Sequence, residues 1–368
     1  MIHLIDLTYY MNTEFDQPFQ ILESHKESLG YLAYVEDGIS ATIVKHLNNE
    51  STELINNIKY SFFKSKNGFF HIPYKTHYYI KRQQPDVIFI QGLVFPFQVL
   101  FLRFTIAKNC KIIVQHHGEQ PFKGIRKIFQ KLADKCIDAY LFTAVENSVP
   151  WVEEKVITDR NKCHEVLEAS TFFKKMDKLL CRAKLGIRSD TVFLWVGRLA
   201  VTKDPLTVLR GFELYLRANA GAKLYMVYQE NDLLAEVNAL LEKSDVLKAS
   251  VCLVGKINHD DLQTWFSAAD YYISASHREA AGYALIEAMA CGCIPVVTGI
   301  PSFKKIVGKY GFLFEMGNAD SLYVALTQAA KIRKEKLSGE VSDHFNSKLS
   351  FKTIAEDILG VCKKLLDI

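Results

Sequence analysis

The sequence predicts an α/β protein made of two doubly wound domains, and three observations support this prediction. The chain has 368 residues, 49% of them apolar, which is more than one average domain and enough for two cores. Short apolar segments alternate with helix-like stretches in both halves, as in parallel sheets covered by helices. This periodicity is lost near residues 171–184, which we interpret as a linker between domains at residues 1–175 and 176–350.

In the first domain, residues 2–7 are predicted as the first strand, followed by a helical stretch near 19–29. A long apolar run at residues 87–107 contains a glycine, a proline and an arginine. It therefore predicts a strand, a turn and an amphipathic helix rather than a membrane span. The later predicted strands are residues 86–90, 111–116 and 138–143.

The second domain shows the same alternation more clearly. Asp204 before Pro205, and Asn258 before a later helix, are N-cap residues typical of helix starts. A polar stretch at residues 338–350 is predicted to separate this domain from a last helix at 351–366. The predicted strands are 191–196, 222–227, 250–254, 271–275, 294–297 and 311–314. The predicted helices are 205–217, 232–242, 259–268 and 283–290.

Composition narrows the class of protein. The formal net charge is only +4, which disfavours nucleic-acid binding and leaves an acidic or phosphorylated small ligand open. The eight cysteines are scattered, and Cys291 with Cys293 is a poor zinc signature without a second pair, so we expect reduced thiols. No basic region followed by a long apolar run opens the sequence, so we expect no signal peptide and a cytoplasmic protein.

The turn after the second domain's first strand carries two cations. Gly197 and Arg198 leave the end of the strand, and Lys203 stands just before the next helix. Arginine offers a fork of hydrogen-bond donors and lysine a point charge, so this turn suits a diphosphate. A solvated surface pair of cations is the alternative.

Two acids flank the start of the helix at residues 283–290. Gly282 allows close approach of the backbone, and the helix beginning at Tyr283 directs its amides and dipole at an anion. Carboxylates beside a diphosphate can accept hydrogen bonds from sugar hydroxyls. Glu287, inside the helix, is placed for a ribose diol, and Glu279, ahead of it, for a hexose. For Glu279, a capping or helix-dipole role remains the alternative.

These motifs, in this order, resemble the retaining glycosyltransferases of family 4, which have the GT-B fold. The likeness covers residues 191 to about 330 and includes the two acids separated by seven residues. It implies two Rossmann-like domains facing across a cleft, an acceptor site in the first and a nucleotide-sugar site in the second. It also implies that the last helix, within residues 351–368, crosses back onto the first domain.

The resemblance further implies a role for each candidate residue. Arg198 and Lys203, beside Gly197, would hold the pyrophosphate, and Glu287 the ribose. The transferred sugar would meet Glu279 and the backbone of Ala280, Ala281, Gly282 and Tyr283, while Lys256 and Ile257 would lie by the base. His117 matches the family's strand histidine and would contact the donor sugar or support the leaving group. His116 would face the other way by alternation, and a core histidine is the alternative for His117.

We expect an enzyme that needs neither metal nor cofactor. The sequence contains no Asp-x-Asp pair to hold a divalent ion, and Arg198, Lys203 and a helix N-terminus can neutralise a leaving diphosphate. No carboxylate is clearly placed as a nucleophile, and the resemblance implies retention by front-face transfer.

The expected activity is hexosyl transfer from a UDP- or GDP-linked sugar to a hydroxyl of a glycan or lipid-linked acceptor. Such a step belongs to polysaccharide, lipopolysaccharide or glycoconjugate synthesis. The alternatives are a phosphorylase or disaccharide synthase of the same fold, and a non-catalytic sugar-nucleotide-binding protein. A dehydrogenase is disfavoured because no Gly-x-Gly-x-x-Gly follows either domain's first strand.

Basic and aromatic residues are interleaved at residues 59–82 and 123–135. Such stretches could dock on a membrane surface or on a lipid-diphosphate acceptor. The alternative is strands and a helix with lysines on their wet faces. Peripheral contact with the inner face of the membrane is therefore a hypothesis, and we expect no nucleic-acid partner.

Overall fold

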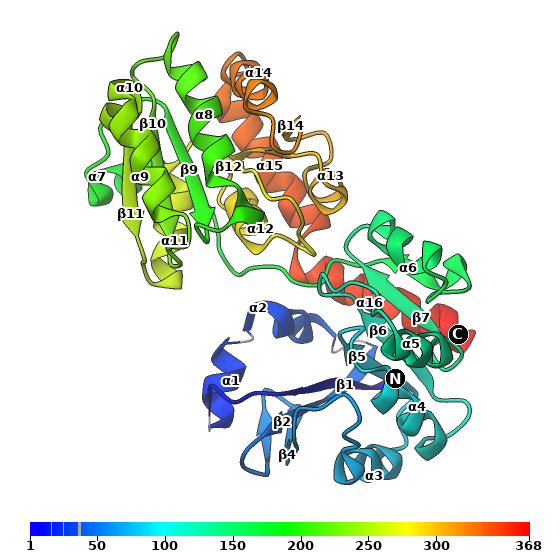
Figure 1. Cartoon of the computed structure of the whole chain (residues 1–368). Coiled ribbons are helices and arrows are strands. Elements are labelled where there is room, and N and C mark those ends of the chain that lie inside the picture. Colours follow the sequence, from blue (N-terminus) through cyan, green and yellow to red (C-terminus); the bar gives the residue numbers. More distant parts are fainter. Residues whose placement is uncertain (16, 25, 36–37) are drawn as a thin grey trace. The chain divides into compact units, whose positions relative to one another are not determined.

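The computed structural model describes residues 1–15, 17–24, 26–35 and 38–368, and these form two compact units (Figure 1). Unit 1 comprises Met1–Ser170 with Phe351–Ile368, and unit 2 comprises Thr171–Ser350. The boundary thus follows Ser170 rather than residue 175, and the last helix groups with unit 1. His25, in the predicted helix at 19–29, lies outside the described residues.

Unit 1 is built on a sheet of order β3-β4-β2-β1-β5-β6-β7-β8. Its strands pair in parallel, except that β3 and β4 form an antiparallel hairpin at one edge. Asn56 and Asn57 turn this hairpin with φ of 49° and 62°, the left-handed conformation that tight hairpin turns require. The strands are β1 (Ile2–Met11), β2 (Ile39–Leu47), β3 (Ser51–Ile55), β4 (Ile58–Lys64), β5 (Val87–Gln91), β6 (Lys111–Gln115), β7 (Ala139–Phe142) and β8 (Cys163–Glu165).

The helices of unit 1 include the one predicted within the apolar run at 87–107. That run folds as β5, a turn at Gly92 with φ of 98°, and α4, as predicted. No helix in the described parts of the chain is both long and apolar enough to cross a membrane. The helices are α1 (Pro18–Ser24), α2 (Lys26–Leu29), α3 (Tyr74–Gln83), α4 (Pro96–Thr105), α5 (Ile125–Asp134), α6 (Val149–Glu153) and α16 (Phe351–Leu366).

Unit 2 has a parallel sheet of order β11-β10-β9-β12-β13-β14, so the chain winds outward from β9 in both directions. Helices therefore cover both faces: α8 packs with α9, α10 and α14, while α11 packs with α7 and α12 (Figure 1). The strands are β9 (Val192–Gly197), β10 (Lys223–Tyr228), β11 (Val251–Gly255), β12 (Tyr271–Ser274), β13 (Ile294–Thr298) and β14 (Phe312–Phe314).

Two segments of unit 2 that were predicted as a linker and as a polar separator, residues 171–184 and 338–350, instead contain helices. α7 lies in the predicted linker, where the Asp177 side chain caps it by accepting a hydrogen bond from Leu180 N. α15 occupies most of the polar stretch at 338–350, because Leu337, Val341 and Phe345 recur every four residues and are buried. The helices are α7 (Lys178–Leu185), α8 (Pro205–Leu216), α9 (Leu234–Lys243), α10 (Asp245–Ser250), α11 (His259–Ala268), α12 (Tyr283–Ala290), α13 (Pro301–Val307), α14 (Ala319–Ala330) and α15 (Lys334–Lys348).

Candidate functional site

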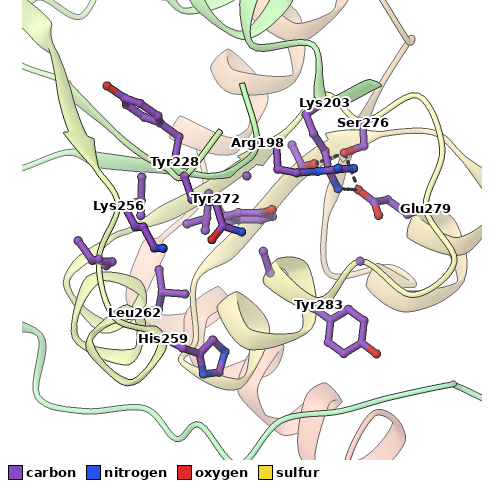
Figure 2. Close-up of a pocket in the computed structure, with 18 of the residues that line it drawn as sticks. Arg198, Lys203, Tyr228, Lys256, His259, Leu262, Tyr272, Ser276, Glu279 and Tyr283 are labelled. Atoms are coloured by element: carbon purple, nitrogen blue, oxygen red, sulfur yellow. Dashed lines mark hydrogen bonds and ion pairs between the residues drawn. The ribbon is translucent and has the colours of Figure 1, made fainter. Parts of the chain in front are cut away.

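A cavity of about 510 Å³ lies at the carboxyl ends of the unit 2 strands, where the strand order reverses between β9 and β12 (Figure 2). Its walls are the loops after β9, β10, β11 and β12, together with the first turn of α12. Ligands bind at this switch point in open parallel α/β sheets. Topology therefore places the cavity where the sequence predicted the donor site.

Most of the predicted donor residues line this cavity, namely Gly197, Arg198, Lys203, Lys256, Ile257, Glu279, Gly282 and Tyr283. Ala280 and Ala281 belong to the same loop without lining the cavity, and the side chain of Ala281 is buried. Glu287 lies behind the wall, and His117 belongs to unit 1. The structure therefore brings together residues from three separate segments of the sequence, 197–203, 256–257 and 279–283.

Asp204 shapes the loop that carries the two cations. It adopts φ of 45°, and its side chain accepts a hydrogen bond from Thr207 N, which caps α8. Its other carboxylate oxygen lies 3.1 Å from His277 Nε2, while His277 N donates to Thr202 O at 2.9 Å. These contacts tie the loop after β9 to the loop after β12, so Lys203 and Glu279 meet.

Glu279 is held on both its carboxylate and its backbone. Lys203 Nζ forms an ion pair with Glu279 Oε1, and Ser276 Oγ donates to the same oxygen at 2.8 Å (Figure 2). Ser302 Oγ donates to the Glu279 carbonyl at 2.7 Å. Arg198 is half-exposed, with its guanidinium 3.6 Å from Glu230. One lysine therefore stands next to the acid predicted to meet the sugar and in the turn predicted to hold the diphosphate.

The first turn of α12 adds a further positive element. Tyr283 and Ala284 line the cavity, so the positive end of the helix dipole faces it. Gly282 precedes this turn with φ of +75°, and a Cβ there would lie 2.5 Å from Phe303 Cε1. Both the backbone conformation and the space therefore require glycine at this position.

Glu287 is 4% exposed and contacts a residue that the sequence analysis did not single out. His259 Nε2 lies 2.7 Å from Glu287 Oε1, and the His259 ring stacks on Phe173 with centroids 5.0 Å apart. His259 lines the cavity and is the first residue of α11. Its place directly after the Asn258 cap, following a strand of the sheet, was the available signal. Tyr228, Tyr272 and Ser276 are further lining residues that the sequence analysis missed.

The predicted histidine of unit 1 ends a chain of hydrogen bonds. His117 follows β6, and its Nε2 lies 2.9 Å from Gln91 Oε1 at the end of β5. Gln91 Nε2 donates to Asp6 Oδ2 at 3.0 Å, and Tyr31 donates to the same oxygen at 2.7 Å. His116 is instead buried against Phe142, which confirms that the two histidines face different ways.

The charge of His117 depends on the carboxylates around it. Its Nδ1 lies 3.5 Å from Glu168 Oε2, a buried oxygen with no hydrogen-bond partner within the described chain. Burial lowers the pKa of His117, but the Glu168, Glu119 and Asp6 carboxylates outweigh it and raise that pKa above its ordinary value. Its side chain is 31% exposed. The surroundings therefore favour a partly accessible imidazolium.

Comparison with known proteins finds a family match within unit 2 and relatives that cover part of the chain. Residues 177–338 match the family model described as Glycosyl transferases group 1. Mannosylfructose-phosphate synthase of Agrobacterium fabrum is 26% identical over 182 residues, which are 46% of this chain and 39% of that protein. Alpha-monoglucosyldiacylglycerol synthase of Streptococcus pneumoniae is 26% identical over 162 residues, 43% and 36% of the two chains. The chain thus spans about two fifths of the length of these relatives.

Solved structures match over the whole chain. Sucrose-phosphate synthase from Thermosynechococcus elongatus has a TM-score of 0.70 at 17% identity and covers 99% of both chains. The catalytic domain of starch synthase IV from Arabidopsis thaliana, bound to ADP and acarbose, has a TM-score of 0.68 at 13% identity and covers 100% of both. At these identities the likeness concerns the fold, and it confirms the predicted GT-B class of two Rossmann-like units.

Proposed function

Because this chain belongs through residues 177–338 to the glycosyl transferases group 1 family, we propose that it transfers a hexose from a nucleotide-activated donor to a hydroxyl group. The observation that carries the proposal is the convergence of Arg198, Lys203 and the N-terminus of α12 with Glu279 in one cavity. Cations and a helix terminus suit a diphosphate, and an acid beside them suits the hydroxyls of a sugar.

The proposed donor lies along this cavity in three parts. Its diphosphate contacts Arg198 and Lys203 beside Gly197, and its transferred sugar contacts Glu279 and the backbone of residues 280–283. The ribose binds at the Glu287–His259 pair, because His259 brings the buried acid to the cavity wall. The base lies by Lys256 and Ile257, after β11. His117 of unit 1 is proposed to contact the donor sugar or support the leaving group.

We propose a metal-independent reaction. Two cationic side chains and a helix N-terminus can neutralise the charge that develops on the leaving diphosphate. Addition of a chelator should leave turnover unchanged. Loss of turnover with chelator, restored by magnesium or manganese, would contradict this proposal.

We also propose that the reaction retains anomeric configuration by front-face transfer. In such a transfer the leaving phosphate oxygen accepts the proton of the acceptor hydroxyl, and the enzyme contributes positioning and electrostatic stabilisation. NMR of the first-formed product reports its anomeric configuration. An inverted product would overturn the proposal.

The acceptor is proposed to be a glycan or a lipid-linked hydroxyl. The names of the relatives support this class, since one makes mannosylfructose phosphate and the other monoglucosyldiacylglycerol. A cytoplasmic location with peripheral contact at the inner face of the membrane is proposed with it. The basic and aromatic stretches of unit 1 support that contact.

A panel of UDP-, GDP- and ADP-sugars, assayed for hydrolysis and for transfer, tests the activity. Arg198→Ala, Lys203→Ala and Glu279→Ala should each lower transfer by about a hundredfold or more. Lys248→Ala, an exposed lysine of the same unit, is the matched control. Normal rates in all three site variants would overturn the site. Donor binding without hydrolysis or transfer would instead indicate a non-catalytic binder, and dependence on inorganic phosphate would indicate a phosphorylase.

A further inference from the structure

Helix α5 of unit 1 presents apolar side chains to the surface. Ile125, Ile128 and Leu132 are 65%, 57% and 43% exposed, and their spacing places them on one face of the helix. A surface helix of a globular protein normally turns its apolar face toward the core. The outward face of α5 therefore exposes apolar side chains to water, which is unfavourable.

The inward side of α5 is polar and well bonded. Gln130 accepts from Phe122 N at 2.8 Å and donates to Leu93 O at 3.2 Å. Asp134 accepts from Tyr140 at 3.0 Å and lies 3.6 Å from Lys162 Nζ. These buried bonds fix the rotation of the helix about its axis, so the apolar residues cannot turn inward without breaking them.

Apolar exposure continues from α5 onto its neighbours. A cluster of six phenylalanines joins the loop before α3 to α4 and α5, with ring centroids 4.9 to 6.5 Å apart. Its members are Phe69, Phe70, Phe97, Phe101, Phe122 and Phe129. Phe70 and Phe101 are exposed, as is Phe104 one turn further along α4, at 86%. Contiguous exposed apolar patches on a monomer mark interaction sites.

The same surface is strongly basic. Residues 123–135 contain Lys123, Arg126, Lys127, Lys131 and Lys135, and their single acid, Asp134, is buried and already paired. Lys127 forms an ion pair with Glu154, just after α6, which neutralises part of this positive charge. The chain as a whole carries a formal net charge of only +4, so this is a local concentration of charge. Self-association through the face would oppose like charges, which disfavours a second copy of the chain as its occupant.

We infer that the α5 face, defined as Ile125, Ile128, Leu132, Phe101 and Phe104 with the five flanking cations, docks on an anionic lipid bilayer. The helix lies in the plane of the interface, with its apolar residues among the acyl chains and its lysines at the headgroups. Each cation near an anionic surface strengthens binding by roughly fivefold. The inference deepens the proposed function by naming the surface that brings unit 1 to a lipid-linked acceptor.

Flotation of the full chain with vesicles tests the docking without any turnover assay. We expect flotation with mixed phosphatidylglycerol and phosphatidylcholine vesicles, release by added salt, and little flotation with phosphatidylcholine alone. Ile128→Glu should lower the bound fraction at least tenfold. Val324→Glu, an exposed apolar residue on α14 of unit 2, is the matched control and should float like the parent chain.

A charge variant tests the attraction of the cations to anionic headgroups, and an insertion probe tests the burial of apolar residues in the bilayer. Lys123→Ala with Lys135→Ala should weaken anionic binding roughly 25-fold by the same factor per cation. Lys331→Ala with Lys336→Ala, on unit 2, should not weaken it. An Ile128→Trp variant should be quenched by brominated lipid in anionic vesicles. Equal circular dichroism spectra and equal nucleotide-sugar hydrolysis in solution establish that each variant is folded.

Three results would overturn the inference. They are a chain that stays in solution at every anionic-lipid content, an Ile128→Glu variant that floats normally, and an Ile128→Trp signal that brominated lipid does not quench. A dimer that Ile128→Glu dissociates would assign the face to a second copy, and retention on poly-glutamate without flotation would assign it to an acidic protein. Flotation without donor hydrolysis would leave the surface standing and refute the proposed enzyme instead.

Discussion

Glu287 Oε1 of α12 lies 2.7 Å from His259 Nε2 of α11, so the buried acid is bound to a histidine on the cavity wall. Glu279 is likewise paired, with Lys203. The two acids are therefore held by nearby cations or donors rather than standing open as a pair of catalytic carboxylates. A sugar hydroxyl that binds either acid would share or replace one of these partners.

Replacing His259 should weaken both unit 2 and its ligand binding. His259→Ala leaves a buried carboxylate without its partner, so the free energy of unfolding should fall by about 1–3 kcal/mol. We expect the affinity for UDP or GDP to fall at least fivefold, as measured by calorimetric titration. His344→Ala, a histidine that bonds Ile306 O away from the cavity, should bind nucleotide normally. Unchanged stability and affinity in His259→Ala would remove this residue from the site.

The Lys203–Glu279 pair should behave as one unit in kinetics. Lys203→Met and Glu279→Gln should each lower kcat/KM for transfer by about a hundredfold. Because each variant already breaks the pair, the double variant should lose less than the product of the two effects. The coupling should be about 0.5–3 kcal/mol. A double-mutant cycle measures it, and simple multiplication of the two effects would show that the residues act independently.

The pH dependence of kcat/KM should depend on the effect of the Glu168 carboxylate on His117. Carboxylates raise the pKa of His117, so its imidazolium persists as pH rises until that raised pKa is passed. Glu168→Gln removes one of these charges and should move the titration of His117, and the alkaline limb of kcat/KM, to lower pH. NMR titration of the ring measures the first directly. Glu146→Gln, an exposed acid of unit 1, should leave both in place. An unshifted titration in Glu168→Gln would contradict the prediction.

Asp270 should make unit 2 less stable as the pH falls into the acid range. It lies 2.8 Å from both Lys178 Nζ and Arg182 Nη2, and it accepts from Val192 N at 2.9 Å. Burial raises the pKa of Asp270, but these partners outweigh burial and lower it below 3.8. The folded state therefore binds the proton less tightly than the unfolded state. The resulting stability is present above the unfolded pKa and is lost as pH falls through the folded pKa.

Asp270→Asn should accordingly cost about 1–3 kcal/mol at neutral pH, because Lys178 and Arg182, which are only partly buried, lose their charged partner. Its stability should also fall less steeply than that of the parent chain as pH drops below about 4. Urea unfolding across this pH range measures both effects. Asp232→Asn, an exposed aspartate of unit 2, should match the parent chain. Parallel pH curves for Asp270→Asn and the parent would show that another group titrates.

Strands and helices were predicted well where their apolar residues recur in a clear pattern, and poorly where that pattern is weak. The unit 2 strands and α11 and α12 were predicted closely, because buried parallel strands are continuous apolar runs. In unit 1, β2 was missed since it carries Lys45 and His46, which are polar but buried. The hairpin of β3 and β4 lies at the sheet edge, where β3 is largely exposed and lacks an apolar run.

Part of the site was predictable because its residues lie next to strands and helices that the sequence itself predicts. Arg198, Lys203, Glu279 and Gly282 stand just after strands or just before helices, which is where a parallel sheet presents its ligand site. The outward face of α5 was not separable from an ordinary wet helix, because its spacing alone does not say which side meets the protein. The buried bonds of Gln130 and Asp134 decide that orientation.

The amino-acid sequence by itself determined the α/β class, the two units and the positions, relative to strand ends, of the cations and acids predicted to bind a donor. These depend on spacing within a few residues, which period and capping rules describe. Only the tertiary structure decided that Lys203 pairs with Glu279, that Glu287 meets His259, and that His117 lies beside Glu168. Such pairs depend on strand order and on packing between distant segments. The packing energies that fix each pair come from many residues far apart in the chain, so no short stretch of sequence reveals them.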